Sequence, residues 1–239
     1  MINHSRTALV GAFGGTYASL AVIDIDELTV SHFALLNSAD FESPMQAIER
    51  YLPSLPSVPG KVALSVAGRV DGDSVVMDHL PWRFTAKEIR AATAANHISL
   101  INEFDALALA LPNMSRFELI ELASGERVLH GTRLVVAAGT GFGAAALTWS
   151  GQARVPVSGP IRHARFALPA GSGLDLGKVF GDGSAVTTED VFSGRGLLAV
   201  YRALAERGGA APTLRTAPAV TKAALANEDE AAAEAVRLT

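Results

Sequence analysis

The sequence predicts an α/β protein of two lobes, each carrying a glycine turn between two apolar strands. The turns are residues 11–16 and 138–143, and short apolar runs flank both of them. Glycine lets backbone N–H groups converge on an anion at a positive φ. Neither turn is followed by helical periodicity, so each is predicted to be a β-hairpin tip rather than the start of a Rossmann or P-loop helix. A phosphate-sized tip in each half predicts two lobes that grip one nucleotide.

The composition excludes several classes of protein. A chain of 239 residues with 49% hydrophobic residues can bury a sizeable core in one large or two small domains. Its net charge of −4 gives no electrostatic case for binding nucleic acid or an anionic membrane. It contains no cysteine, which excludes disulfides and thiol catalysis. With no signal-peptide core and no apolar run of about 20 residues, we expect a cytoplasmic protein.

The first half of the chain alternates strands and helices. The expected elements are strands within 7–36, a helix from Pro44 to Leu52, a strand at 61–68, a turn at 71–73, a helix at 86–95, a strand at 98–101 and a short helix at 106–111. Ser43 can cap the first helix, and Pro44 suits its first turn. Thr85 and Glu88 have the spacing of a capping box.

The second half repeats this plan. The expected elements are a hairpin at 134–147, loops with short strands at 151–175, a helical turn capped at Thr188, a helix at 197–205 and a final Ala-rich helix from Pro218 to Leu238. No short tandem repeat is present, only this coarse duplication.

The candidate site residues follow from the two turns and one strand end. Thr16 and Thr140 each place a hydroxyl beside turn amides, although ordinary hairpin tips remain the alternative for both turns. The strand at 98–101 delivers Asn102 and Glu103 at its carboxyl end, where ligand crevices of α/β sheets lie. The predicted phosphate-binding residues are Gly11, Gly14, Gly15, Thr16, Gly139, Thr140, Gly141 and Gly143.

Ordered along the chain, these motifs resemble those of the bacterial glucokinase family, in the hexokinase–actin ATPase superfamily. The resemblance is carried by residues 9–16, 99–104, 138–143 and 192–202 and by His163. It implies a two-lobed sugar-kinase (actin-like ATPase) fold with ribonuclease H-like lobes. The small lobe would be residues 1–111, and the large lobe residues 112–239, incomplete at its C-terminus.

The family reaction implies roles for particular residues. It transfers the γ-phosphate of ATP to the 6-hydroxyl of glucose or a related hexose, with Mg²⁺ held against the phosphates. By resemblance, Glu103 takes the position of the catalytic base. Asn102, His163 and Glu189 take positions that bind the sugar.

Three positions depart from the family pattern. Ala12 replaces an Asp near the metal and phosphates, so Mg²⁺ loses an oxygen and no metal ligand is assigned. Glu103 replaces the base Asp and is one methylene longer, which displaces the carboxylate by ~1 Å or more. Pro160 replaces a sugar-binding Glu and offers neither an acceptor side chain nor an N–H donor. We therefore expect strongly impaired catalysis.

Other interpretations stay open at this stage. The chain could be a non-catalytic sugar- or nucleotide-binding regulatory relative, as Ala12 and Pro160 favour, or a degraded gene product without stable function. Uncovered apolar surface predicts low stability relieved by aggregation or by a homodimer. Asp78, His79 and Trp82 are interpreted as surface and packing residues. The scattered histidines lack metal-ligand spacing, so no zinc site is predicted.

Overall fold

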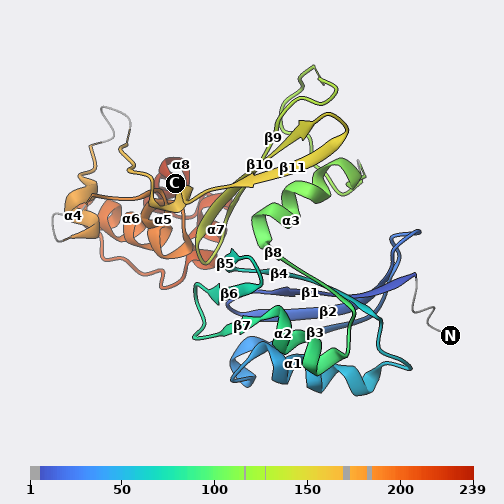
Figure 1. The fold of residues 1–239 in the computed structure, drawn as a ribbon. Coiled ribbons are helices and arrows are strands. Elements are labelled where there is room, and N and C mark those ends of the chain that lie inside the picture. The colour runs from blue at the N-terminus through green and yellow to red at the C-terminus, as the bar shows by residue number, and fades with distance from the viewer. Residues whose placement is uncertain (1–5, 116, 127, 169–172, 182–184) are drawn as a thin grey trace. The chain divides into compact units, whose positions relative to one another are not determined.

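The computed structural model describes residues 6–115, 117–126, 128–168, 173–181 and 185–239 (Figure 1). The chain divides into two compact units. Unit 1 comprises Met1–Gly131 and Trp149–Pro156, and unit 2 comprises Thr132–Thr148 and Val157–Thr239. Each unit is described here by itself.

Unit 1 is built on a five-stranded sheet of order β3-β2-β1-β4-β8. Its strands are β1 (Thr7–Phe13), β2 (Tyr17–Asp24), β3 (Val30–Asn37), β4 (Lys61–Val66) and β8 (His97–Asn102). The first three form an antiparallel meander, and β1, β4 and β8 run parallel. The parallel strands therefore end at the same edge, where the first glycine turn and Asn102 are found.

Helices cover one face of this sheet (Figure 1). They are α1 (Pro44–Tyr51) and α2 (Ala86–Thr93). Their buried residues Ile48 and Ile89 pack in one core with Leu9, Leu20 and Leu64 of the sheet. A second sheet of three antiparallel strands, β5 (Gly68–Asp71), β6 (Ser74–Met77) and β7 (Arg83–Thr85), extends the unit. Helix α3 (Glu103–Ala110) follows β8 directly.

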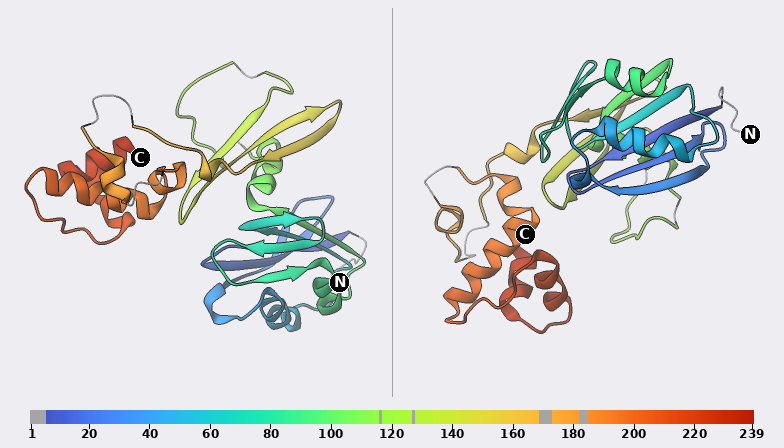
Figure 2. Two further views of the ribbon diagram at one scale, coloured as in Figure 1. Left: turned by 60° about the vertical axis from the view of Figure 1, so that its left-hand side comes forward. Right: turned by 90° about the horizontal axis from the view of Figure 1, so that it is seen from below.

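Unit 2 combines a long hairpin with a helical cluster (Figure 2). The hairpin strands are β9 (Arg133–Ala138) and β10 (Phe142–Ser150), beside which β11 (Ala153–Ser158) pairs. The end of β10 from Trp149 and the part of β11 up to Pro156 are counted with unit 1. The helices are α4 (Leu176–Phe180), α5 (Thr188–Val191), α6 (Gly194–Arg207), α7 (Ala217–Leu225) and α8 (Glu230–Leu238). Their core includes Tyr201, Val220 and Ala232, each at most 1% exposed.

The short 3₁₀ turns complete the element list. They are η1 (Ser38–Asp40), η2 (Leu52–Ser54), η3 (Leu111–Asn113) and η4 (Ile161–His163). None of the helices that the structure describes has the length and apolar composition that crossing a membrane requires.

Most of the predicted elements are confirmed. Both glycine turns are hairpin tips, because β1 pairs antiparallel with β2 and β9 with β10. Ser43 caps α1 by accepting from Gln46 N. Thr85 and Glu88 form the capping box of α2.

Several boundaries differ because side-chain caps act earlier than expected. Helix α3 begins at Glu103 rather than residue 106, since Asn102 Oδ1 accepts from Phe104 N at 2.9 Å. Helix α6 begins at Gly194 rather than residue 197, because Ser193 caps it. Thr187, not Thr188, caps α5.

The single helix expected from Pro218 to Leu238 is wrong. The segment forms two helices, and Asn227 between them adopts a left-handed conformation with φ of 52°. Asp229 then caps α8 by accepting from Ala232 N at 2.9 Å. The expectation of loops at 151–175 includes residues 169–172, which lie outside the described residues.

Candidate functional site

The tip of the first hairpin is held by Ser38. Gly14 N donates to Tyr17 O at 2.9 Å, which closes the turn. The fully buried Ser38 donates from Oγ to Gly14 O at 3.0 Å and from N to Thr16 O at 2.9 Å. Ser38 therefore hydrogen-bonds to the carbonyl groups of both Gly14 and Thr16. These bonds fix the conformation of the turn in the absence of a ligand.

Gly11 and Ala12 lie in β1 rather than in the tip. A Cβ on Gly11 would fall 2.9 Å from a methyl carbon of Leu20 and 2.9 Å from one of Leu64, so a larger residue here would displace the ends of these two buried side chains. Ala12 is exposed and its methyl group offers no oxygen. The predicted phosphate role of Gly11 stays a prediction.

Asn102 links the end of β8 to the second sheet of unit 1. Its Nδ2 donates to Gly68 O at 2.8 Å, while Oδ1 caps α3 through Phe104 N. An amide has two N–H donors and two acceptor lone pairs, so this side chain retains capacity for a further ligand. It holds Glu103 at the first position of α3.

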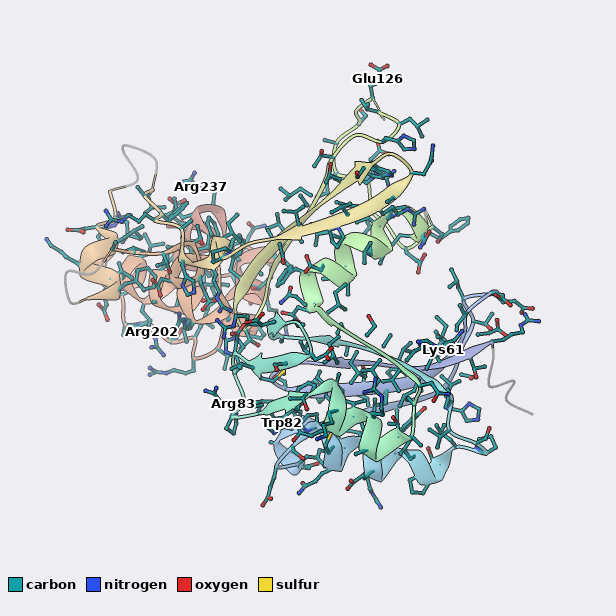
Figure 3. The ribbon with its side chains drawn as sticks, in the orientation of Figure 1. Lys61, Trp82, Arg83, Glu126, Arg202 and Arg237 are labelled. Carbon is teal, nitrogen blue, oxygen red and sulfur yellow. The ribbon has the colours of Figure 1, made fainter. Side chains whose placement is uncertain are left out.

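Glu103 lies in a half-buried, negatively charged setting. Burial raises the pKa of its carboxyl, the nearby Asp78 raises it further, and His79 opposes both. Sequence reasoning interpreted Asp78 and His79 as surface residues; both are exposed, yet they act on Glu103. Trp82, labelled in Figure 3, is 2% exposed and packs edge-on against Phe13, as a packing residue does.

The second glycine turn is tied to the helices of unit 2. Gly139 N donates to Gly141 O at 2.8 Å, and Gly139 O accepts from Gly194 N at 2.9 Å. Phe142 N donates to Glu189 Oε2 at 3.3 Å. The second turn is therefore hydrogen-bonded to the start of α6 and, through Phe142, to Glu189, which is a predicted sugar-binding residue.

Thr140 and Gly143 are also predicted to bind phosphate, and they differ in their position relative to this turn. Thr140 occupies the tip between Gly139 and Gly141. Gly143 lies inside β10, buried and paired with Ala137.

The structure brings the segments of the predicted sugar ligands Glu189 and His163 together. Thr188 N donates to Ala164 O at 2.8 Å, and Thr188 Oγ1 donates to Ile161 O. The Glu189 side chain is 18% exposed, with its Oε1 3.6 Å from an Arg195 nitrogen. These contacts place α5 beside the 3₁₀ turn that carries His163.

The His163 ring lies in a basic setting. It is exposed, and its Nε2 accepts from Arg162 Nε at 3.2 Å. Pro160 precedes this 3₁₀ turn at its N-cap position and makes no side-chain cap.

A pocket of about 1040 Å³ opens behind the second turn. It is formed by the turn, the start of α6 and the exposed side of α7. Phe192, Leu197 and Leu225 give it apolar walls, and Thr140 and Lys222 bring polar groups to it. Its size and composition match those of small-molecule sites, which are apolar with a few convergent polar groups.

The residues present do not fit a protein-only metal site. Across the described ranges, no group of three or more His, Asp or Glu side chains could hold an ion. Mg²⁺ bound with nucleotide phosphates needs only one or two carboxylates from the protein. In unit 1, Glu103 and Asp78 are the carboxylates near the strand ends.

Some residues reach the candidate site only through contacts between distant parts of the chain, and the sequence alone does not assign them a role there. Ser38 and Asp78 reach the strand-end region through backbone hydrogen bonds to Thr16 and Ala67, and His79 lies close to Gly15. Phe192, the C-cap residue of α5, and Lys222 of α7 both line the pocket. Phe192 lies in the segment 192–202 that carries the resemblance but is given no role, and no spacing along the chain marks the other four residues.

Comparisons with known proteins agree with this geometry. The Glucokinase family model matches residues 9–239. The glucokinase of Tolumonas auensis is 30% identical over 227 residues, covering 94% of this chain and 70% of that protein. The glucokinase of Hahella chejuensis is 28% identical over 239 residues, covering 99% and 74%.

Solved structures show the same fold. The crystal structure of glucokinase from an Antarctic psychrotroph has a TM-score of 0.77 and 27% identity, covering 97% of this chain and 74% of that one. Glucokinase from Balamuthia mandrillaris, solved in complex with glucose, has a TM-score of 0.75 at 19% identity, with coverage of 97% and 72%. The fold is that of the two-lobed, actin-like sugar kinases. On the match of the family model to nearly its whole length, the chain belongs to the glucokinase family.

Proposed function

We propose that this protein transfers the γ-phosphate of ATP to the 6-hydroxyl of glucose, at a rate lowered by three replaced site residues. Family membership supports the reaction. The observation that carries it is the arrangement in unit 2. There the second glycine turn fronts a large apolar pocket, and Phe142, next to that turn, bonds to Glu189.

The nucleotide is assigned to the pocket and the turns. Its base and ribose would occupy the apolar walls formed by Phe192 and Leu197. The backbone amides of Gly139–Gly141 are assigned to the phosphates, those of Gly14–Thr16 keep the same predicted role, and Mg²⁺ would arrive as part of the MgATP substrate. Glu189 and His163 would orient the sugar hydroxyls.

Glu103 would act as the general base. Its carboxylate removes the proton from the 6-hydroxyl while that oxygen bonds to the γ-phosphorus and the bond to ADP breaks. The raised pKa of Glu103 places its titration closer to neutral pH than that of an ordinary glutamate. Because the base must be ionised, we expect kcat/KM to rise with pH through that pKa.

The replacements remove transition-state contacts without removing the fold. Ala12 provides no oxygen for the metal or its water shell. Glu103 reaches about 1 Å too far, a displacement that can cost on the order of 10²-fold. Pro160 leaves a sugar hydroxyl without its partner. Contacts that act as a unit are not additive, so restoring one of them gives little.

A coupled assay for glucose 6-phosphate tests the proposal. The chain is compared with Glu103→Gln and with the triple variant Ala12→Asp/Glu103→Asp/Pro160→Glu. We expect activity below the ordinary range of about 1–10³ s⁻¹. The triple variant should gain activity, Glu103→Asp alone should gain little, and Glu103→Gln should lose what remains.

The outcomes separate the candidate functions. Turnover within the ordinary range would contradict the impairment. Binding of ATP and glucose by calorimetry with no turnover in any variant would assign the chain to the alternative, a sugar- and nucleotide-binding regulatory role, which Ala12 and Pro160 favour. Gain in the triple variant supports the kinase assignment.

A further inference from the structure

Both oxygens of the Glu189 carboxylate have partners within unit 2. Oε2 accepts from Phe142 N at 3.3 Å, directly after the second glycine turn. Oε1 lies 3.6 Å from Nη2 of Arg195, the second residue of α6. The carboxylate is therefore held at one oxygen by the main chain and at the other by a cationic side chain.

The same nitrogen of Arg195 also bonds to the residue after Glu189. Nη2 donates to Asp190 Oδ1 at 3.2 Å. The other oxygen of Asp190, Oδ2, accepts from Thr187 N at 3.0 Å and from Thr187 Oγ1 at 2.7 Å, within the capping box of α5. Asp190 is thus fixed to the start of α5, and it fixes in turn the guanidinium group that lies beside Glu189.

Arg195 occupies a position that a helix by itself does not favour for a cation. It lies in the first turn of α6, where the positive end of the helix macrodipole opposes a positive charge. The carboxylates of Glu189 and Asp190 offset this opposition. The Arg195 side chain is 66% exposed, and exposed ion pairs contribute little to stability. The main consequence of the interaction is therefore the orientation of Glu189, not the stability of the fold.

The start of α6 contacts the second glycine turn as well. Gly194 N donates to Gly139 O at 2.9 Å. The next residue, Arg195, contacts Glu189. Two neighbouring residues of one helix therefore hold the predicted phosphate-binding turn and the predicted sugar-binding carboxylate, and the two are fixed relative to each other.

We propose that Arg195 is a positioning residue for sugar binding: it holds the Glu189 carboxylate in the orientation that accepts hydrogen bonds from sugar hydroxyls. This inference rests on the proposed function for the role of Glu189. An ionised carboxylate has about four acceptor sites, so Phe142 N and Arg195 leave sites for a ligand. Without the guanidinium group, Oε1 loses this partner, and the carboxylate can rotate about the hydrogen bond that Oε2 makes with Phe142 N.

The first test measures this orientation by NMR spectroscopy of the ligand-free full chain. The amide of Phe142 reports the hydrogen bond to Glu189, and Glu189→Ala gives the values for the broken bond. Arg195→Met removes the cation and keeps an unbranched side chain that suits a helix. It should move the Phe142 amide resonance toward its position in Glu189→Ala and speed exchange of this amide with solvent by up to about 5-fold. Near-UV circular dichroism verifies that each variant is folded.

The matched control is Arg202→Met. Arg202, labelled in Figure 3, is an exposed arginine of the same helix, about 10 Å further along its axis. Its replacement removes the same charge and should leave the Phe142 amide unchanged. Arg195→Lys should retain much of the wild-type behaviour, because a single nitrogen of Arg195 makes both contacts. An unchanged Phe142 amide in Arg195→Met, or equal changes in Arg202→Met, overturns the inference.

The second test separates sugar binding from the other steps of the reaction. In glucose phosphorylation, Arg195→Met should raise KM for glucose by up to about 5-fold and leave kcat and KM for ATP within about twofold. Asp190→Asn, which weakens the attachment of Arg195, should raise KM for glucose as well. The double variant should be no worse than Arg195→Met alone, because both substitutions act through one contact.

The outcomes of the two tests distinguish this inference from the proposed function. If no variant phosphorylates glucose but the Phe142 amide responds as expected, the proposed function fails and the link from Arg195 to Glu189 stands. If phosphorylation holds while Arg195→Met lowers kcat without raising KM for glucose, or raises both KM values equally, the positioning role of Arg195 is wrong.

Discussion

Glu103 shows how a functional requirement opposes stability at one residue. Its carboxyl is half-buried beside Asp78, so ionisation costs free energy in the folded state and the pKa is raised. A base is useful only when ionised. The folded protein therefore loses stability over the pH range in which the site becomes active, which is common for catalytic groups.

Replacing Glu103 by Gln should raise stability at pH 8 while removing the base. A raised folded-state pKa contributes stability below the unfolded-state pKa, and this is lost as pH rises through the folded-state pKa. Urea unfolding at pH 8 should show the variant to be more stable than the wild type, and at pH 4 the two should be similar. Any glucose phosphorylation should fall by about 10²–10⁴-fold.

Glu118 provides a control for this prediction, because its pKa is shifted in the direction opposite to that of Glu103. Hydrogen bonds from Ser115 lower the pKa of Glu118, so its ionised form favours the folded state above the unfolded-state pKa. Glu118→Gln should therefore show no stability gain at pH 8. A gain in both variants would mean that loss of general negative charge, not the setting of Glu103, is responsible.

At the scale of elements, the contact between α5 and α6 fixes the position of Glu189. A Cβ on Gly196 would overlap the carbonyl oxygens of Asp190 and Val191. Glycine lets the first turn of α6 lie against the end of α5. Glu189 thereby keeps its hydrogen bond from Phe142 N.

Gly196→Ala should force these two helices apart. Overpacking of this kind typically costs about 1–3 kcal/mol in the free energy of unfolding. Glucose affinity, measured by calorimetry, should fall as well, because Glu189 moves with α5. In the matched variant Gly208→Ala the nearest atom lies 3.4 Å away, and the change should stay within about 0.5 kcal/mol. Equal effects in both variants would exclude the close contact as the cause.

Elements with local signals could be predicted from the sequence, and those set by distant contacts could not. The hairpins and the helix caps at Ser43 and Thr85 depend on residues that are close neighbours in the sequence. The break near Asn227 is not, because an Ala-rich segment favours a helix throughout. There the packing of Val220 and Ala232 into one core selects two short helices instead.

The candidate site divides in the same way. Glycine turns and the Asn102–Glu103 pair carry a recognisable pattern. Asp78 does not, because its place near the strand ends depends on the backbone hydrogen bond from Asp78 N to Ala67 O. Such long-range pairing leaves no periodicity to find.

At the scale of the whole molecule, each unit has a core of its own. Leu64, fully buried, belongs to the core of unit 1, and Leu204, 5% exposed, to that of unit 2. Multi-domain proteins commonly depart from two-state unfolding. We therefore expect calorimetric unfolding with two transitions.

Leu64→Ala and Leu204→Ala should lower different transitions. Each deletes buried side-chain volume, at a cost of about 2–5 kcal/mol. A non-hydrolysable ATP analogue at about 100 times its Kd should raise the transition that Leu204→Ala lowers, by about 2.7 kcal/mol, because the pocket lies in unit 2. A single transition lowered equally by both substitutions would contradict separate cores.

In unit 1, a series of hydrogen bonds from Phe13 through Ala67 to Asp78 uses main-chain atoms alone. Substitution of a side chain cannot delete a main-chain donor or acceptor, unless proline is introduced. Substitutions therefore leave these backbone hydrogen bonds at the site in place, while the side chains attached to this backbone can change. This makes the protein a favourable starting point for directed evolution, in which activity toward sugars is selected by side-chain replacement without redesign of the backbone.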